Sequence, residues 1–282
     1  MPRPPKFGGL NESEWKDIVS HWALKEHDTK IISALLHFAK VGETWPELKG
    51  RTGISEHVAI KWLTRFLSTH DFNTEIRWLQ CERAHLYDKY TILVDHTTTF
   101  LRYKPSNAPA DKGYRYTSGH KGVCFKYQCA TTLQGTPIGV SAAQEGRRND
   151  VFLFVPPITA HVTNDFAILD GGYPGLNGHC RIPIRKPVNR EFTEDQMSFN
   201  RVLSRARSRI EREFSVVKRY ALIKKTNLEM ANHSLFVRLV FLVAHVLQHN
   251  RNATGDTQYT ASAADLQPGN QCVCNWRKRL RE

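Results

Sequence analysis

The stretch Tyr90-Thr91-Ile92-Leu93-Val94-Asp95 decides the fold of this chain. A near-continuous apolar run of this length is typical of a central strand buried on both faces. A second run of the same kind, Phe166-Ala167-Ile168-Leu169-Asp170, leads into Gly171-Gly172-Tyr173-Pro174. Each run closes on an aspartate, so we expect both carboxylates to emerge where their strands end and the sheet edge opens to solvent.

Further strands are expected around these two. The β-branched and aromatic segment Thr97–Tyr103 should pair back on the first strand as a hairpin. Lys121–Thr132 and Thr136–Ala142 flank Leu133-Gln134-Gly135, a hairpin-type turn, and Asp150–Pro156 is another strand candidate.

Two helices follow the strands. One opens at Ser198 or Asn200 and reaches about Tyr220, and the other spans roughly Asn232–Asn250 and is apolar around most of its circumference, so it should be buried. Antiparallel strands, a crossover, a further strand and then helices suit an α/β domain of ribonuclease-H-like type, with a mixed sheet and flanking helices, over residues 85–250.

The preceding region, residues 11–82, is predicted as an all-α helix-turn-helix domain. Residues 1–10 read as a flexible leader rich in Pro and Gly, and residues 251–282 as a C-terminal tail. Asn11 or Ser13 can cap a first helix, and a second helix is expected over about Thr29–Lys40.

The helix-turn-helix itself is predicted between Trp45 and Phe66. A short helix ends at Gly53, which can adopt the left-handed conformation, and Ser55 caps the next helix. Its apolar positions are Val58, Ala59, Trp62, Leu63 and Phe66. This places His57, Lys61 and Thr64 outward, toward a DNA groove. The alternative is an ordinary helical hairpin that packs on the next domain.

The charge of the chain favours a polyanionic partner. Forty Lys and Arg stand against 27 Asp and Glu, a formal net charge of +13 at pH 7. Simple solubility is the alternative explanation of this balance. The excess concentrates between Arg201 and Lys225, where only Glu211 and Glu213 oppose the cations. From this segment we select Arg205, Arg209 and Arg212 as contacts to the DNA backbone.

Asp95, Asp170 and Glu211 are the candidate metal ligands and catalytic residues. Phosphodiester cleavage needs an activated oxygen nucleophile and a stabilised leaving oxygen, and two metals ~4 Å apart supply both. Magnesium prefers hard oxygen ligands, and a few carboxylates suffice because water and phosphate complete its coordination. Each carboxylate taken alone has a simpler explanation, as a turn residue or a surface ion pair. The basic context favours the catalytic interpretation.

Five stretches together carry a family resemblance. They are Val94-Asp95-His96-Thr97, Lys121–Gln128, Gly146–Asp150, Leu169-Asp170-Gly171-Gly172-Tyr173-Pro174 and the pattern Asn200…Ser204…Arg207…Ile210-Glu211…Phe214…Lys218-Arg219-Tyr220. These resemble motifs of the PIF/Harbinger-like DDE transposases, also described as DDE superfamily endonucleases. The resemblance covers about residues 45–250, and its last motif is the most specific.

The resemblance implies that Asp95, Asp170 and Glu211 form a triad that binds Mg²⁺ or Mn²⁺. It also implies cut-and-paste transposition in the nucleus, with terminal inverted repeats and a target site as DNA partners. A Myb-like accessory DNA-binding protein is a further implied partner, and a homo-oligomer is also expected. The chain departs from the family at His96, where a Gly is usual, and at Gly171, where Ser or another small residue often follows the aspartate. It also departs at Asn149, which replaces a His.

The sequence thus predicts a DDE-type DNA transposase or endonuclease that cleaves and joins DNA phosphodiesters at element termini by two-metal catalysis. One alternative is a domesticated, catalytically silent DNA-binding protein that keeps the fold. Another is a ribonuclease H-like nuclease that acts on RNA. No run approaches the ~18 apolar residues of a membrane span, so no membrane partner is expected.

Overall fold

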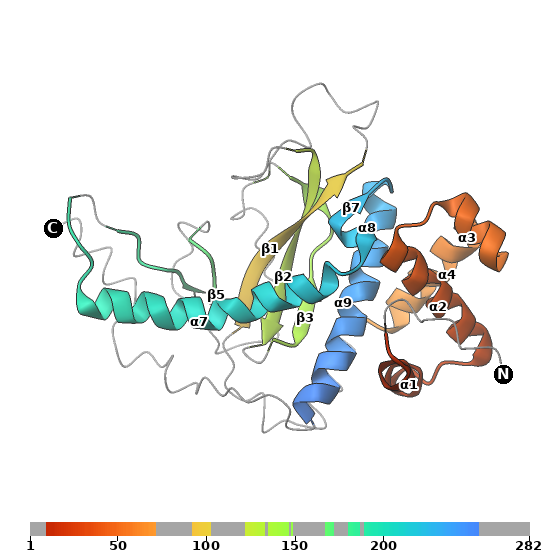
Figure 1. Cartoon of the computed structure of the whole chain (residues 1–282), viewed down its shortest axis with the longest axis horizontal. Helices are drawn as coiled ribbons and strands as arrows, with labels where there is room; N and C mark the ends of the chain where they lie inside the picture. Colours follow the sequence, from red (N-terminus) through yellow and green to blue (C-terminus); the bar gives the residue numbers. More distant parts are fainter. Residues whose placement is uncertain are drawn as a thin grey trace.

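The computed structural model describes residues 10–71, 92–102, 122–132, 135–146, 148, 167–171, 180–186 and 189–253. The predicted strand Asp150–Pro156, the Asn149 departure, most of the leader and residues 254–282 lie outside these ranges. In Figure 1 a sheet lies at the centre, and the long helix α7 (Glu194–Val217) crosses it. Helix α9 (Met230–Ala253) stands between the sheet and the N-terminal helices.

The first two helices begin near the predicted caps. Helix α1 spans Glu12–His21, and Asn11 caps it: the Asn11 side chain accepts from the Glu14 N–H, while the Glu14 carboxylate accepts from the Asn11 N–H. Helix α2 spans Glu26–Val41 and so begins earlier than the predicted Thr29. It ends at Gly42, whose φ of 72° lies in the left-handed region that glycine tolerates.

Helices α3 (Trp45–Thr52) and α4 (Glu56–Thr69) form the predicted pair. Gly53 ends α3 in the left-handed conformation, with φ 75°, and the Ser55 side chain accepts from the backbone of α4. One predicted core position of α4 is wrong. Val58 is 48% exposed, and Leu67 is buried in its place, because the apolar stripe of α4 follows Ala59, Leu63, Phe66 and Leu67.

Within the described residues, seven strands form one mixed sheet in the order β3-β2-β1-β5-β6, with β4 beside β2 and β7 beside β1. Their bounds are β1 Ile92–Leu101, β2 Cys124–Thr132, β3 Pro137–Val140, β4 Gln144–Glu145, β5 Ala167–Ile168, β6 Cys180–Arg181 and β7 Lys225–Thr226. Strands β1, β2 and β3 are antiparallel neighbours, whereas β5, β6 and β7 run parallel to their partners. This mixed sheet with flanking helices fits a ribonuclease-H-like domain.

The hairpin expected at Thr97–Tyr103 is wrong. Strand β1 continues without a break to Leu101, and Thr97, Thr98 and Thr99 pair with β2 in the same register as Asp95. No Gly, Pro, Asn or Asp follows Asp95 within the strand, so the chain has no residue suited to a tight turn, and β-branched threonines extend the strand instead. Asp95 therefore lies within β1, opposite Cys129, and does not end its strand.

Three helices complete the described fold. They are α7 (Glu194–Val217), α8 (Ala221–Lys224) and α9 (Met230–Ala253). Helix α7 begins earlier than the predicted Ser198, because Thr193 and Gln196 cap each other's backbone N–H groups. Its apolar residues recur at helical spacing and form a buried stripe: Leu203, Ala206, Ile210, Phe214 and Val217.

One continuous core joins the N-terminal helices to the sheet-bearing part of the chain. Phe38 of α2 and Trp45 of α3 both pack against Phe236 of α9, with ring centroids 5.1 and 6.0 Å away. Helices α1 and α4 also contact α9, and α2 contacts α8. The N-terminal helices therefore share their packing with the sheet, and the division of the chain into domains stays a prediction.

Helix α9 corrects the expectation about apolar runs. Over Met230–Gln248 its mean hydropathy is 1.5, which makes it long and apolar enough to cross a membrane by length and composition. Most of this stretch is nevertheless buried inside the protein, as predicted for the last helix. The burial is that of a core helix, which passes the same test.

Candidate functional site

The sheet register brings Asp95 and Asp170 to the same level. Strand β5 runs parallel to β1 and pairs Leu93 with Ile168. Each aspartate lies two residues beyond its member of that pair, so the carboxylates meet where β5 has ended and β1 continues. Strand β5, unlike β1, closes just before its aspartate as the sequence predicted.

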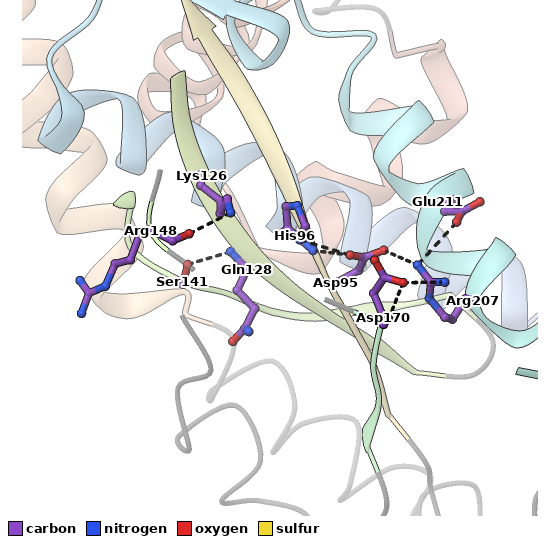
Figure 2. Close-up of polar contacts among 10 residues, drawn as sticks. Asp95, His96, Lys126, Gln128, Ser141, Arg148, Asp170, Arg207 and Glu211 are labelled. Atoms are coloured by element: carbon purple, nitrogen blue, oxygen red, sulfur yellow. Dashed lines mark hydrogen bonds and ion pairs between the residues drawn. The ribbon is translucent and has the colours of Figure 1, made fainter. Parts of the chain in front are cut away.

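A single guanidinium joins these two carboxylates to Glu211. Arg207 of α7 lies 3.3 Å from Asp95 Oδ2, 3.1 Å from Asp170 Oδ1 and 3.9 Å from Glu211 Oε1. Figure 2 shows the three carboxylates around the Arg207 side chain, which reaches them from α7. The structure thus brings together three residues that are far apart in the sequence.

The three carboxylates differ in their exposure to solvent. The Asp95 side chain is 10% exposed, that of Asp170 39% and that of Glu211 61%. Burial raises the pKa of Asp95 above its ordinary value, while the N–H of His96 and the charge of Arg207 act in the opposite direction. Solvent exposure therefore increases across the site, from Asp95 on β1 to Glu211 on α7.

Backbone groups fix the two aspartates. The His96 N–H donates to Asp95 Oδ1 at 2.7 Å, and the Gly171 N–H donates to Asp170 Oδ1 at 2.6 Å. Two of the residues at which the chain departs from the family motifs, His96 and Gly171, thus each anchor a carboxylate through the backbone. The ring of His96 also lies beside Asp95, with Nδ1 3.5 Å from Oδ1.

The spacing of Arg207, four residues before Glu211, places it beside that carboxylate on one helix face. Its contacts with Asp95 and Asp170 were not predicted from the sequence. Arg185 donates to the carbonyl of Gly171 at 2.7 Å. Lys218 is half-buried, and burial lowers its pKa while the charges of Cys129 and Asp95 act to raise it. No local sequence pattern places Arg185 or Lys218 near the aspartates.

The donor set has the chemistry that a hard divalent cation requires. Three carboxylates face one cationic group, and carboxylate oxygens are the preferred ligands of Mg²⁺ and Mn²⁺. In their present positions, however, no three acidic, His or Cys side chains among the described residues lie close enough to hold a metal ion. The guanidinium of Arg207 separates them instead.

Glu213 contrasts with Glu211 on the same helix. Glu213 is buried, and burial raises its pKa to about 7, with the charge of Arg251 acting in the opposite direction. It packs near the turn at Gly135, where a Cβ atom would lie 3.6 Å from Glu213 Oε1. The two glutamates of α7 therefore differ in environment, with Glu213 buried and Glu211 61% exposed.

The basic residues chosen for backbone contacts all lie on α7. Arg205 and Arg212 are exposed, and Arg209 is half-buried. The ion pairs of Asp95, Asp170 and Glu211 involve Arg207, and Arg205 and Arg212 lie on the same helix. The exposed face of α7 is therefore cationic beside the carboxylates that Arg207 joins.

The face of α4 that is predicted to contact DNA bases lies beside the start of α9. His57, Lys61 and Thr64 are exposed, as expected. His57 and Lys61 also line an open pocket with Ser55, Glu56, Ile60 and Asn232, so the start of α9 borders the first turns of α4. Asn232 reaches Glu56 at 3.5 Å. Part of the predicted face therefore borders a neighbouring helix.

A comparison with protein families identifies the region that carries this site. A family model described as "DDE superfamily endonuclease" matches residues 94–262. The chain belongs to this family. Searches of curated proteins and of solved structures found no match.

Membership of the DDE superfamily endonucleases supports a transposase-like nuclease that acts on DNA, and endonucleases of this kind generally use divalent metals. The matched region includes most of β1, all of β5 and all of α7, and with them Asp95, Asp170 and Glu211. It does not include α1–α4, so the family says nothing about the helix-turn-helix prediction.

Proposed function

We propose that this protein is a DDE-type DNA transposase that cleaves and joins DNA phosphodiesters at the ends of a mobile element. Asp95, Asp170 and Glu211 are its catalytic carboxylates and metal ligands. The observation that carries the proposal is their convergence on one guanidinium from β1, β5 and α7, inside the region that matches the endonuclease family.

Each carboxylate has a distinct part in holding Mg²⁺ or Mn²⁺. Asp95 and Asp170 are oriented by backbone N–H donors, so both carboxylates are held beside Arg207. Glu211 is the most exposed of the three and stands on α7. When bound, the metal pair activates the attacking oxygen and stabilises the leaving oxygen of the phosphodiester.

DNA binding is assigned to two surfaces. Arg205, Arg209 and Arg212 contact backbone phosphates close to the carboxylates, because they lie on the helix that carries Glu211. His57, Lys61 and Thr64 of α4 read base edges. The net charge of +13 supports a polyanionic substrate.

The finer assignment is to the PIF/Harbinger-like group of DDE transposases, with terminal inverted repeats and a target site as substrates. Its support is the motif pattern around Asp95, Asp170 and Glu211 in the sequence. The same assignment includes action in the nucleus, a Myb-like accessory DNA-binding protein and assembly into a homo-oligomer.

A cleavage assay on the terminal repeats that flank the gene tests this proposal. Purified full-length protein with Mn²⁺ should nick or cut DNA at the repeat ends, and chelation of the metal with EDTA should stop the reaction. Random duplex DNA of equal length is the control. Cleavage that persists in EDTA, or that ignores the repeats, would contradict the proposal.

One observation favours a second candidate, a domesticated DNA-binding protein that no longer cuts. Arg207 lies among the three carboxylates where a metal ion is needed, and the His96 ring lies beside Asp95. If the protein binds the repeats but shows no metal-dependent cleavage, this second function is correct.

A further inference from the structure

We propose that the Arg207 guanidinium competes with divalent metal for Asp95, Asp170 and Glu211. In this arrangement Arg207 is the counter-ion that keeps the carboxylates together, and it must swing away before metal can bind. The inference rests on the proposed function, because it assumes that these carboxylates are the metal ligands.

The candidate site carries an excess of negative charge. Three carboxylates within 3.9 Å of one guanidinium carry more negative charge than a single cation neutralises. Like charges this close repel each other, so without a cation the carboxylates would separate or take up protons. Arg207 therefore supplies the role that a metal would otherwise fill, and the two cannot use the same oxygens at once.

The contacts of Arg207 with the carboxylates are weak. Charge-assisted bonds between guanidinium and carboxylate are usually ~2.7–2.9 Å long, whereas the shortest of its three contacts is 3.1 Å. Its Nε is buried and has no hydrogen-bond partner among the residues that the structure describes. A buried donor without a partner raises the free energy of this arrangement, so departure of the guanidinium costs less than for a well-satisfied pair.

The Arg207 guanidinium can move from the carboxylates to solvent. The Arg207 side chain is 18% exposed, and its long flexible stem starts from α7, the helix that also carries the open Glu211. Rotation about the side-chain torsions can move the guanidinium toward solvent without any change in the helix backbone. Metal binding to the wild-type protein must therefore include the free energy of breaking the Arg207 contacts.

The test is a Mn²⁺ titration without DNA, by isothermal calorimetry and by electron paramagnetic resonance of the free ion, at one pH and one salt concentration. Full-length wild type is compared with Arg207→Gln and with Arg201→Gln. Arg201 is exposed on the same helix and is not an ion-pair partner of the carboxylates, so this variant controls for the lost charge.

We expect Arg207→Gln to bind Mn²⁺ about tenfold more tightly than wild type, which is about 1.4 kcal/mol. Arg201→Gln should stay within about twofold of wild type, since an exposed charge is screened by salt. In thermal unfolding without metal, Arg207→Gln should melt at a lower temperature than wild type, and Mn²⁺ should raise its melting temperature by more than it raises that of wild type.

Each outcome decides one point. Equal or weaker Mn²⁺ binding by Arg207→Gln overturns the competition and leaves the metal site standing. Equal tightening in both variants overturns it as well, because general charge would then explain the effect. No Mn²⁺ binding by any protein overturns the proposed metal site itself. If Arg207→Gln does not fold, Arg207→Lys replaces it: tighter binding supports the competition, and unchanged or weaker binding overturns it.

Discussion

The carboxylates around Arg207 and the outward face of α4 were both expected to be functional, but their residues are arranged differently in the structure. Asp95, Asp170 and Glu211 come from three separate elements and meet at one guanidinium. His57, Lys61 and Thr64 come from one helix, and all three side chains are exposed. His57 and Lys61 also line an open pocket. Convergence across the fold is stronger support for chemistry than exposure on one helix, because surface polar residues need no special explanation.

The largest effect should come from removal of any one of the three carboxylates. Asp95→Asn, Asp170→Asn and Glu211→Gln should each reduce cleavage by more than ~100-fold, since even outer partners of metal ligands cost ~10–100-fold when lost. Binding to DNA should remain, because each change removes charge with little change in shape. Gel-based cleavage and binding assays on the same DNA separate the two properties.

Glu213→Gln is the matched control for Glu211→Gln, since Glu213 lies on the same helix but is buried. It should cleave as well as wild type does. If Glu213→Gln abolishes cleavage and Glu211→Gln does not, the third carboxylate has been assigned to the wrong residue.

The next effect concerns the choice of DNA site by α4. Alanine at His57, Lys61 and Thr64 together should remove the preference for the terminal repeat over random DNA, since each good base contact gives ~1–3 kcal/mol of discrimination. The fold should survive, because Ala59, Leu63, Phe66 and Leu67 still fill the core.

Competition binding with both DNAs at one salt concentration measures this preference. A triple variant that keeps its preference would show that α3 and α4 are a packing hairpin. The contacts of α4 with α9 would then be its main role.

A smaller effect is expected from the basic face of α7. Neutralising Arg205, Arg209 and Arg212 together should weaken binding to every DNA and flatten its salt dependence, because each lost phosphate contact lowers the slope of log affinity against log salt by ~0.9. Binding measured at several salt concentrations gives that slope. An unchanged slope would assign these arginines to folding or solvation.

The smallest effect is a pH dependence of stability from Glu213. Its pKa is about 7 in the folded protein against an ordinary value of 4.5, so its contribution is fully present below pH 4.5 and is lost as pH rises through 7. The loss is at most ~3 kcal/mol. Glu213→Gln should therefore gain stability relative to wild type between pH 5 and pH 8.

Denaturant unfolding of both proteins at the two pH values measures this difference. An equal pH dependence in wild type and Glu213→Gln would show that Glu213 is well solvated in its ionised form. That result would remove the contrast between the buried and the open glutamate of α7.

The elements of the fold were predictable where local chemistry decides them. The caps at Asn11 and Ser55, the left-handed Gly53 and the buried stripe of α7 all follow from residue type and spacing. Strand β1 was predicted too short, because an apolar run and a β-branched run look like two strands until pairing with β2 joins them.

The carboxylates of the candidate site, and the ion pair between Arg207 and Glu211, follow from sequence position and spacing. Asp95 and Asp170 were chosen for their places after apolar runs, and Glu211 for its place in a basic helix. The position of Arg207 among all three depends on the register of β1 with β5 and on the packing of α7 across the sheet, which no local pattern encodes.

Anomalous diffraction from crystals of the protein soaked in Mn²⁺ shows directly whether the three carboxylates bind metal. We predict a peak within coordination distance of carboxylate oxygens from Asp95, Asp170 and Glu211, with the Arg207 guanidinium displaced. A peak elsewhere, or no peak with Arg207 still in contact with the three carboxylates at saturating Mn²⁺, would contradict this prediction.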